Sequence, residues 1–292
     1  MKKKRDIIMT LAFGFIFLAS LSVMLYPTFS NWWNQRHQTR AVASYKEEVA
    51  QMDNGETERI LAEAHDYNQK LSKLYAPFNN FNDIPGYDDI LNISGTGIMG
   101  YVSIPNINVE LPIYHGTSEG VLQIASGHIQ GSSLPVGGAS THAVISGHRG
   151  LPSARLFTDL DQIVEGDTFT INVLNEVYTY EVERILIILP NETDKLAIFP
   201  GEDIVTLMTC TPYGVNSHRL LIRGHRIETI YDKKIKVGAD ALQVDSMKVI
   251  PIVFVPLLIM LIIYWHITGR RKHIRITEDT IHNLPKKTKK PE

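Results

Sequence analysis

The sequence predicts a mainly β protein, a closed β-barrel with an N-terminal helical extension and two flanking transmembrane helices. Three observations support this fold class. Short runs of alternating apolar and polar residues, separated by Gly, Pro and Asn, fill the middle of the chain. Helical periodicity precedes these runs. Finally, an apolar run without Asp, Glu, Lys or Arg stands near each end of the chain.

The first apolar run covers residues 7–26 and follows a basic cluster at residues 2–5. Its length of about 20 residues is enough to span the hydrocarbon core of a bilayer. A cleavable signal peptide is the alternative, but the run is long for one, and no convincing small-x-small cleavage site precedes Trp32 and Trp33. We therefore predict an uncleaved membrane anchor.

A second apolar run covers residues 249–267, contains Pro251 and Pro256, and leads into a basic cluster at residues 270–272. Proline is tolerated in membrane helices. Each basic cluster lies on the side of its apolar run away from the central segment. The positive-inside rule therefore places both termini in the cytoplasm and the central segment outside the cell. Buried core helices are the alternative, which the length, the lack of charge and the basic flanks together disfavour.

Composition narrows the possible functions. The formal net charge is -2 at pH 7, which argues against a nucleic-acid-binding protein, because such proteins concentrate basic residues on one face. Cys210 is the only cysteine, so the chain cannot form an intramolecular disulfide. Exported proteins usually avoid an unpaired reactive thiol, so Cys210 favours a chemical role. A buried and unreactive cysteine is the alternative.

The helical extension lies between the first apolar run and the strands. Apolar residues recur every three or four positions over residues 40–75, which predicts two helices separated by a break at residues 53–55. A polar linker follows at residues 76–87. We interpret the helices as a stalk or a packing hairpin rather than as part of a catalytic site.

The remaining central segment has the period of strands. Strands are predicted at residues 100–105, 109–114, 143–146, 168–173, 177–189, 204–209 and 219–227. A turn or two of helix is expected at residues 118–124 and at residues 153–160. Short strands between Gly, Pro and Asn turns are typical of a closed barrel.

Three side chains with complementary chemistry stand at predicted strand ends. Cys210 ends one strand, and a turn at residues 212–216 brings Arg219 back beside it on the next. His148 follows another strand. A thiolate is an effective nucleophile and nearby positive charge favours it. Arginine suits the stabilisation of an oxyanion, and histidine suits proton transfer. The three residues therefore predict nucleophilic catalysis by a thiol.

Other interpretations of these residues stay open. His148 is compatible with a surface position, and Arg219 with a structural ion pair. A zinc site is a further alternative. Its candidate ligands are Cys210, His142, His218 and His225. No pair among them has a convincing metal-ligand spacing, so we predict no metal.

Two motifs closely resemble the sortase family. They are residues 206–219 (TLMTCTPYGVNSHR) and residues 146–152 (SGHRGLP). The specific likeness is to class C sortases, the pilin polymerases of Gram-positive bacteria. Residues 97–105 and 111–117 agree with the first strands of that family's barrel. The resemblance covers nearly the whole chain, including the helical extension and both membrane segments.

The resemblance implies a sortase-type cysteine transpeptidase that needs no cofactor. Cys210 would be the nucleophile, His148 the general acid and base, and Arg219 the oxyanion-stabilising residue. By this likeness, Cys210 attacks the Thr-Gly bond of an LPxTG-like sorting signal on a pilin and forms a thioester. A lysine amine of the next pilin subunit then resolves the thioester, leaving an isopeptide bond. The implied partners are therefore pilin subunits, and the implied location is the outer face of the cell membrane.

One departure from the class C pattern concerns the lid. Class C sortases typically carry an acidic residue, a proline and an aromatic residue before the barrel, and the acid contacts the catalytic arginine. The matching positions here are Ala76, Pro77 and Phe78. Because alanine cannot form the ion pair, we expect a lid of Pro77 and Phe78 that is held more weakly, unless Asp83 or another acid substitutes.

These assignments divide the chain into six regions. They are a basic end and transmembrane helix (1–30), a helical extension with a lid-like linker (31–96), a sortase-like catalytic barrel (97–232), a linker (233–248), a second transmembrane helix (249–268) and a basic cytoplasmic tail (269–292). Two other functions remain: a sortase that anchors surface proteins to peptidoglycan, and a non-catalytic, membrane-tethered binding scaffold.

Overall fold

The computed structural model describes residues 2–229 and residue 258. The predicted linker at residues 233–248, the second transmembrane helix at residues 249–268 and the basic tail at residues 269–292 lie outside the described residues, apart from residue 258.

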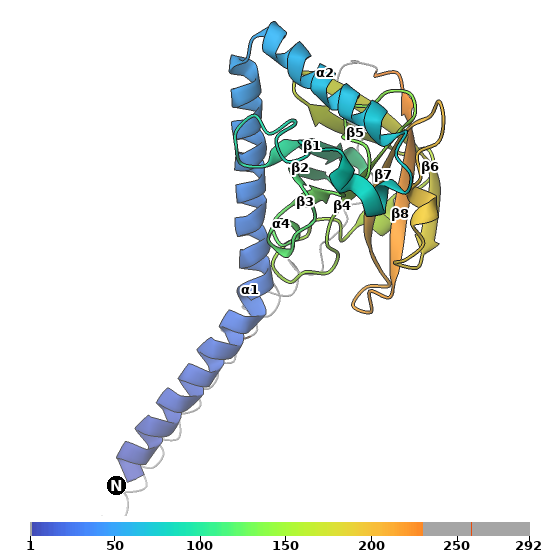
Figure 1. The fold of residues 1–292 in the computed structure, drawn as a ribbon. Helices are drawn as coiled ribbons and strands as arrows, with labels where there is room; N and C mark the ends of the chain where they lie inside the picture. Colours follow the sequence, from blue (N-terminus) through green and yellow to red (C-terminus); the bar gives the residue numbers. More distant parts are fainter. Residues whose placement is uncertain (1, 230–257, 259–292) are drawn as a thin grey trace, which may run out of the picture. The chain divides into compact units, whose positions relative to one another are not determined.

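Helix α1 (Lys2–Gln51) joins the first apolar run and the start of the helical extension into one continuous element that passes through Pro27 (Figure 1). Large apolar side chains in its N-terminal part are exposed, and the helix is long and apolar enough to cross a membrane. Its later part contacts the barrel. The Tyr45 hydroxyl donates to the Met99 carbonyl at 3.2 Å and accepts from the Leu174 amide at 2.8 Å.

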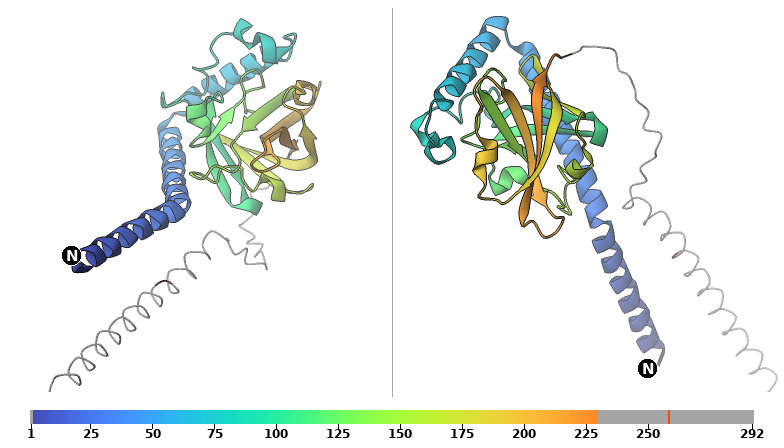
Figure 2. Two further views of the ribbon diagram at one scale, coloured as in Figure 1. Left: turned by 90° about the horizontal axis from the view of Figure 1, so that it is seen from below. Right: turned by 90° about the vertical axis from the view of Figure 1, so that its right-hand side faces the viewer.

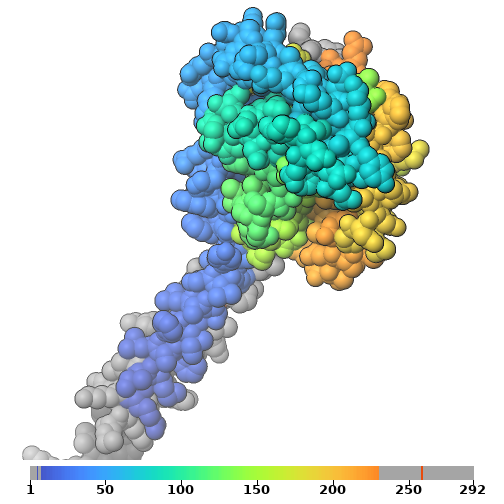
Figure 3. All heavy atoms as spheres, viewed as in Figure 1, coloured from blue at the N-terminus to red at the C-terminus, as the bar shows by residue number. Residues whose placement is uncertain are grey.

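Helix α2 (Asn54–Leu71) begins after the predicted break. The Asp53 side chain accepts a hydrogen bond from the Glu56 amide at 2.7 Å and so caps the helix. Its buried apolar residues recur at helical spacing and join the main core: Ile60, Ala64, Tyr67 and Leu71. Figure 3 shows that α2 and the linker after it cover the face of the barrel nearest the viewer.

Short elements connect the helices to the strands. The linker contains helix α3 (Pro77–Asn80) and the 3-10 helix η1 (Phe81–Asp83). The other short helices are η2 (Pro105–Ile107), α4 (Glu119–Leu122), η3 (Leu160–Gln162) and η4 (Thr193–Leu196).

Within the described residues, eight strands form a closed barrel in the order β1-β2-β3-β4-β7-β8-β6-β5. Figure 2 shows the barrel from two further sides. Their bounds are β1 (Ile98–Ile104), β2 (Val109–His115), β3 (Ser126–His128), β4 (Thr141–Ser146), β5 (Thr168–Val173), β6 (Glu176–Ile188), β7 (Asp203–Thr211) and β8 (His218–Ile227). The pairs β2–β3 and β4–β7 are parallel, and the others are antiparallel. The mainly β closed barrel with a helical extension is therefore confirmed.

Two expectations need correction. Strand β3 was not predicted, because three residues with a central glycine carry no readable period. Residues 153–160 form turns rather than helix, and η3 begins only at Leu160. By contrast, the helical turn expected at residues 118–124 is α4, which Ser118 caps by accepting a hydrogen bond from the Val121 amide.

Alternation along β7 gives the barrel wall two apolar faces. Val205 and Leu207 point into the main core, whereas Met208 points outward. The outward face carries a second, smaller cluster, here called the outer cluster. Its buried members are Val144, Ile188, Leu196 and Leu221, and its partly buried members are Phe78, Ile129, Leu186 and Met208.

Candidate active site

Cys210 and Arg219 are direct partners in the antiparallel pair of β7 and β8. The turn between these strands is tight: the amides of Val215 and Asn216 both donate to the Pro212 carbonyl, at 3.1 and 3.0 Å. The Thr211–Pro212 peptide bond is cis. The turn therefore places Cys210 and Arg219 at paired positions on neighbouring strands, as the sequence indicated.

His148 reaches the same end of the barrel through the parallel pair of β4 and β7. The last paired residues are Ser146 and Met208. Beyond them, the Gly147 amide donates to the Met208 carbonyl at 3.0 Å, and the Thr209 hydroxyl donates to the Gly147 carbonyl at 2.7 Å. His148 is the next residue, so it stands level with Cys210.

These pairings define a row across the outward face of the barrel, here called the active-site row. It runs from His148, in the loop after β4, through Cys210 on β7 and Arg219 on β8 to Ile188 on β6. The next row contains Ser146, Met208, Leu221 and Leu186 and belongs largely to the outer cluster. The outer cluster is therefore continuous with the three polar residues.

The side chains in the row contact other groups in this structure. His148 Nε2 lies 3.7 Å from Glu119 Oε2 on α4, and the His148 side chain is 28% exposed. The Arg219 guanidinium donates to the carbonyls of Asn216 at 3.2 Å and His218 at 3.1 Å. Cys210 is a half-buried free thiol. Sequence reasoning missed Glu119, because a contact between α4 and a distant loop leaves no local signal.

A second arginine stabilises the loop after His148. Arg149 forms an ion pair with Asp161, donates to the Thr211 hydroxyl at 3.4 Å, and lies over the Tyr213 ring. These groups line a pocket of about 350 Å³ that also contains Ile187 but none of the three candidate catalytic residues. Arg149 therefore ties the loop after β4 to the turn after β7.

Comparison with known proteins agrees with this geometry. Residues 102–227 match the Sortase domain family. Sortase C1 from Streptococcus agalactiae is 48% identical, covers 65% of this chain and 100% of its own, and superposes with a TM-score of 0.61. The chain belongs to the sortase family.

Other solved relatives are also class C sortases. Sortase C from Streptococcus pneumoniae is 43% identical over 65% of this chain and 97% of its own, with a TM-score of 0.58. Sortase C from Clostridium perfringens, solved with its C-terminal cell wall sorting motif, is 38% identical over 65% of this chain and all of its own, with a TM-score of 0.58.

Curated relatives match over shorter stretches. Sortase A of Streptococcus agalactiae is 29% identical over 39% of this chain, and sortase D of Bacillus subtilis is 29% identical over 44%. This chain spans only 47% and 63% of those two relatives. The solved structures thus confirm the resemblance to class C sortases. Membership of the sortase family confirms that the protein is a sortase-type cysteine transpeptidase.

The segment predicted to be a lid, Ala76 to Phe78, lies against the barrel. Phe78 packs on the outer cluster together with Met208, one row from Cys210. Gly131 permits this approach: a Cβ there would lie 2.9 Å from the Phe78 Cα, and its φ is +93°. Among the described residues, no carboxylate forms an ion pair with Arg219.

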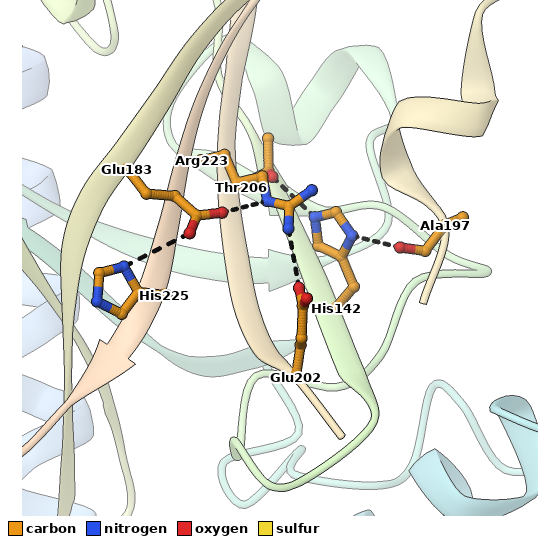
Figure 4. Close-up of polar contacts among 7 residues, drawn as sticks. All are labelled: His142, Glu183, Ala197, Glu202, Thr206, Arg223 and His225. Atoms are coloured by element: carbon orange, nitrogen blue, oxygen red, sulfur yellow. Dashed lines mark hydrogen bonds and ion pairs between the residues drawn. The ribbon is translucent and has the colours of Figure 1, made fainter. Parts of the chain in front are cut away.

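One of the three histidines named in the zinc alternative, His142, has a different role. His142 is fully buried, and its ring nitrogens face the Ala197 carbonyl and the Thr206 hydroxyl, each at 2.8 Å (Figure 4). Burial lowers the pKa of His142 to about 4, so the ring is neutral at pH 7. Within residues 2–229, no group of three metal-ligating side chains forms around Cys210.

Proposed function

We propose that this sortase is a class C transpeptidase that joins pilin subunits through isopeptide bonds on the outer face of the cell membrane. The observation that carries the proposal is the active-site row. It combines a thiol, an imidazole and a guanidinium at one end of the barrel, beside an apolar surface suited to an extended peptide.

In the first half of the reaction, the Cys210 thiolate attacks the carbonyl carbon of threonine in an LPxTG-like sorting signal. Arg219 stabilises the negative charge that develops on the carbonyl oxygen. His148 donates a proton to the glycine amine as the peptide bond breaks. The products are a threonyl thioester on Cys210 and a released C-terminal fragment.

In the second half, the amine of a pilin lysine attacks the thioester carbon. His148 accepts the proton that the amine loses, and the Cys210 sulfur leaves as thiolate. An isopeptide bond forms and the enzyme returns to its starting state. No step needs a cofactor or a metal.

Two rearrangements follow from the present contacts. The Arg219 guanidinium must leave the carbonyls of Asn216 and His218 to reach an oxyanion beside Cys210. The lid segment must also move if the peptide is to lie on the outer cluster, since Phe78 occupies part of that surface. The enzyme thus requires substrate binding to assemble its site.

Membrane anchoring is part of the proposal. Helix α1 would hold the barrel at the membrane, and the run at residues 249–268 would supply the second span, with both termini in the cytoplasm. Anchoring would keep the enzyme beside membrane-bound pilins.

The test is to incubate the full chain in detergent with an LPxTG-type peptide and to detect a thioester on Cys210 by mass spectrometry. The Cys210→Ala variant is the control. An adduct in the native enzyme alone, converted to a peptide-lysine conjugate by an added pilin domain, would support the proposal. Binding of the peptide without any adduct would favour the scaffold interpretation.

A further inference from the structure

The connection between β6 and β7, here called the 189–202 segment, contributes to the outer cluster. Its residue Leu196, the last of η4, is buried against that cluster. Leu196 therefore lies inside the outer cluster next to the active-site row, although it belongs to a segment without strand pairing.

His142 holds this segment at the residue after Leu196. A carbonyl oxygen only accepts hydrogen bonds, so the Ala197 carbonyl requires the proton on His142 Nδ1, and Nε2 then accepts from the Thr206 hydroxyl (Figure 4). Both partners of the neutral ring are satisfied in a fully buried position. Breaking this contact would leave a buried polar group unpaired.

Arg223 on β8 fixes the segment at two further points. Its guanidinium lies 4.8 Å from the centre of the Phe199 ring, and Nη2 donates to Glu202 at 2.9 Å. Nε forms an ion pair with Glu183 on β6 at 2.6 Å, although the geometry of this contact is not that of a hydrogen bond. In addition, the Gly201 amide donates to the Ser140 hydroxyl at 2.8 Å.

In the described structure, the side-chain hydrogen bonds and ion pairs of the first half of the segment join only residues of that half. The Leu189 amide donates to the Glu192 carboxylate, and Lys195 pairs with Asp194. Both of these pairs are exposed. Leu196 thus lies at the boundary between two parts of the segment. The exposed part before it is bonded only locally, and His142 and Arg223 attach the part after it to the barrel.

We propose that His142, supported by Arg223, is a positioning residue of this sortase: it holds the Ala197 carbonyl and thereby keeps Leu196 in place inside the outer cluster, which shapes the surface for the apolar side chains of the peptide substrate. His142 lies on β4 and contacts Ala197 and Thr206, whereas His148 follows the end of that strand six positions later, so His142 takes no part in the chemistry. The proposal rests on the proposed function of the outer cluster as the peptide-binding surface.

A matched pair of variants separates the two contacts of His142. In His142→Asn, the amide nitrogen is as many bonds from the backbone as Nδ1 and can still donate to Ala197. In His142→Gln, the amide nitrogen corresponds to Nε2 and keeps Thr206 instead. We expect His142→Gln to raise the KM for an LPxTG peptide about tenfold with kcat within about twofold, and His142→Asn to stay near the native KM.

Two further variants control for stability. Thr206→Val removes the other partner of the His142 ring and should lower Tm without raising KM. Phe199→Ala is a partly exposed change that removes the ring under Arg223, and it should raise KM as His142→Gln does. If His142→Gln does not fold, Phe199→Ala still decides the proposal.

Hydrogen exchange on the full-length enzyme gives a measurement that is independent of activity. Faster exchange at residues 190–198 in His142→Gln than in His142→Asn is expected. Equal exchange, or equal KM values in an active enzyme, would overturn the positioning role while leaving the transpeptidase proposal intact. An inactive native enzyme would instead count against the proposed function. Hydrogen exchange would then still test whether His142 holds the 189–202 segment.

Discussion

Cys210 and Arg219 face each other directly across β7 and β8, yet the Arg219 guanidinium bonds to the carbonyls of Asn216 and His218. The backbone register thus pairs the two residues, while the guanidinium contacts carbonyls of the turn. The side chain itself is held by the turn that creates the register. The Arg219 guanidinium therefore has to leave these two carbonyls before it can stabilise an oxyanion formed at Cys210.

Replacing Arg219 should affect the chemical step more than binding. Loss of one oxyanion donor typically lowers kcat by about 100- to 1000-fold, so we expect a loss of that order in Arg219→Ala, with KM changed less than about threefold. Arg219→Lys keeps the charge but lacks the planar fork and should retain intermediate activity. Steady-state kinetics with an LPxTG peptide measures both effects.

A thermal unfolding scan serves as the control for Arg219→Ala, because its present hydrogen bonds also close the turn after β7. A variant with native Tm and native kcat would contradict the oxyanion role. Lower Tm together with native kcat would assign Arg219 to the turn alone.

Phe78 should limit access to Cys210. It packs on the outer cluster, and Met208, which packs on the same cluster, lies one row from the thiol. We expect Phe78→Ala to speed the reaction of Cys210 with a thiol reagent several-fold, and Phe78→Leu, which keeps an apolar side chain, to speed it less. The measurement is the labelling rate by mass spectrometry, for which Cys210 is the only thiol. An unchanged rate in Phe78→Ala would show that the lid does not shield the site.

The sequence was most informative where structure is local. Strand β5 has the predicted bounds, and the turn at Pro212 was enough to predict that Cys210 faces Arg219. Strand β3 was not predicted, because its three residues are defined by pairing with β2 and β4 rather than by their own pattern. His148 was a candidate because it follows a predicted strand, and the likeness to sortases implied its role, but its register with Cys210 cannot be derived from spacing.

Contacts between distant segments explain the other omissions. The Glu119 carboxylate meets His148 from a four-residue helix, and Ala197 accepts from His142 across a long separation in the chain. Neither pair has a spacing that periodicity can detect. By contrast, the sequence itself shows that position 76 is an alanine and not an acid. Among the described residues, no carboxylate forms an ion pair with Arg219.

Stability should fall as the pH drops below neutrality because two histidines are buried. Burial lowers the pKa of His128 and of His142 to about 4, against an ordinary value of 6.5. Between these values the unfolded chain binds protons that the folded chain excludes. Their contribution is therefore complete above pH 6.5 and is lost progressively towards pH 4, at roughly 1 kcal/mol per histidine per pH unit at most.

Urea unfolding at pH 7.5, 6.5, 5.5 and 5.0 checks this dependence. Because other groups also titrate, the decisive comparison is with His142→Asn, which lacks one titrating ring and should have a shallower slope. Identical slopes in the two proteins would mean that His142 does not contribute to the pH dependence.

Restoring an acid at the lid should tighten it. Ala76 has a φ of 47°, a left-handed conformation that Asp and Asn adopt more readily than most residues, so Ala76→Asp should fold normally. By the likeness to class C sortases, the new carboxylate should pair with Arg219 and slow Cys210 labelling. Ala76→Asn, which has the same shape without charge, is the control. The slowing should weaken in high salt and vanish in an Arg219→Ala background, and equal rates for the two variants would refute the pairing.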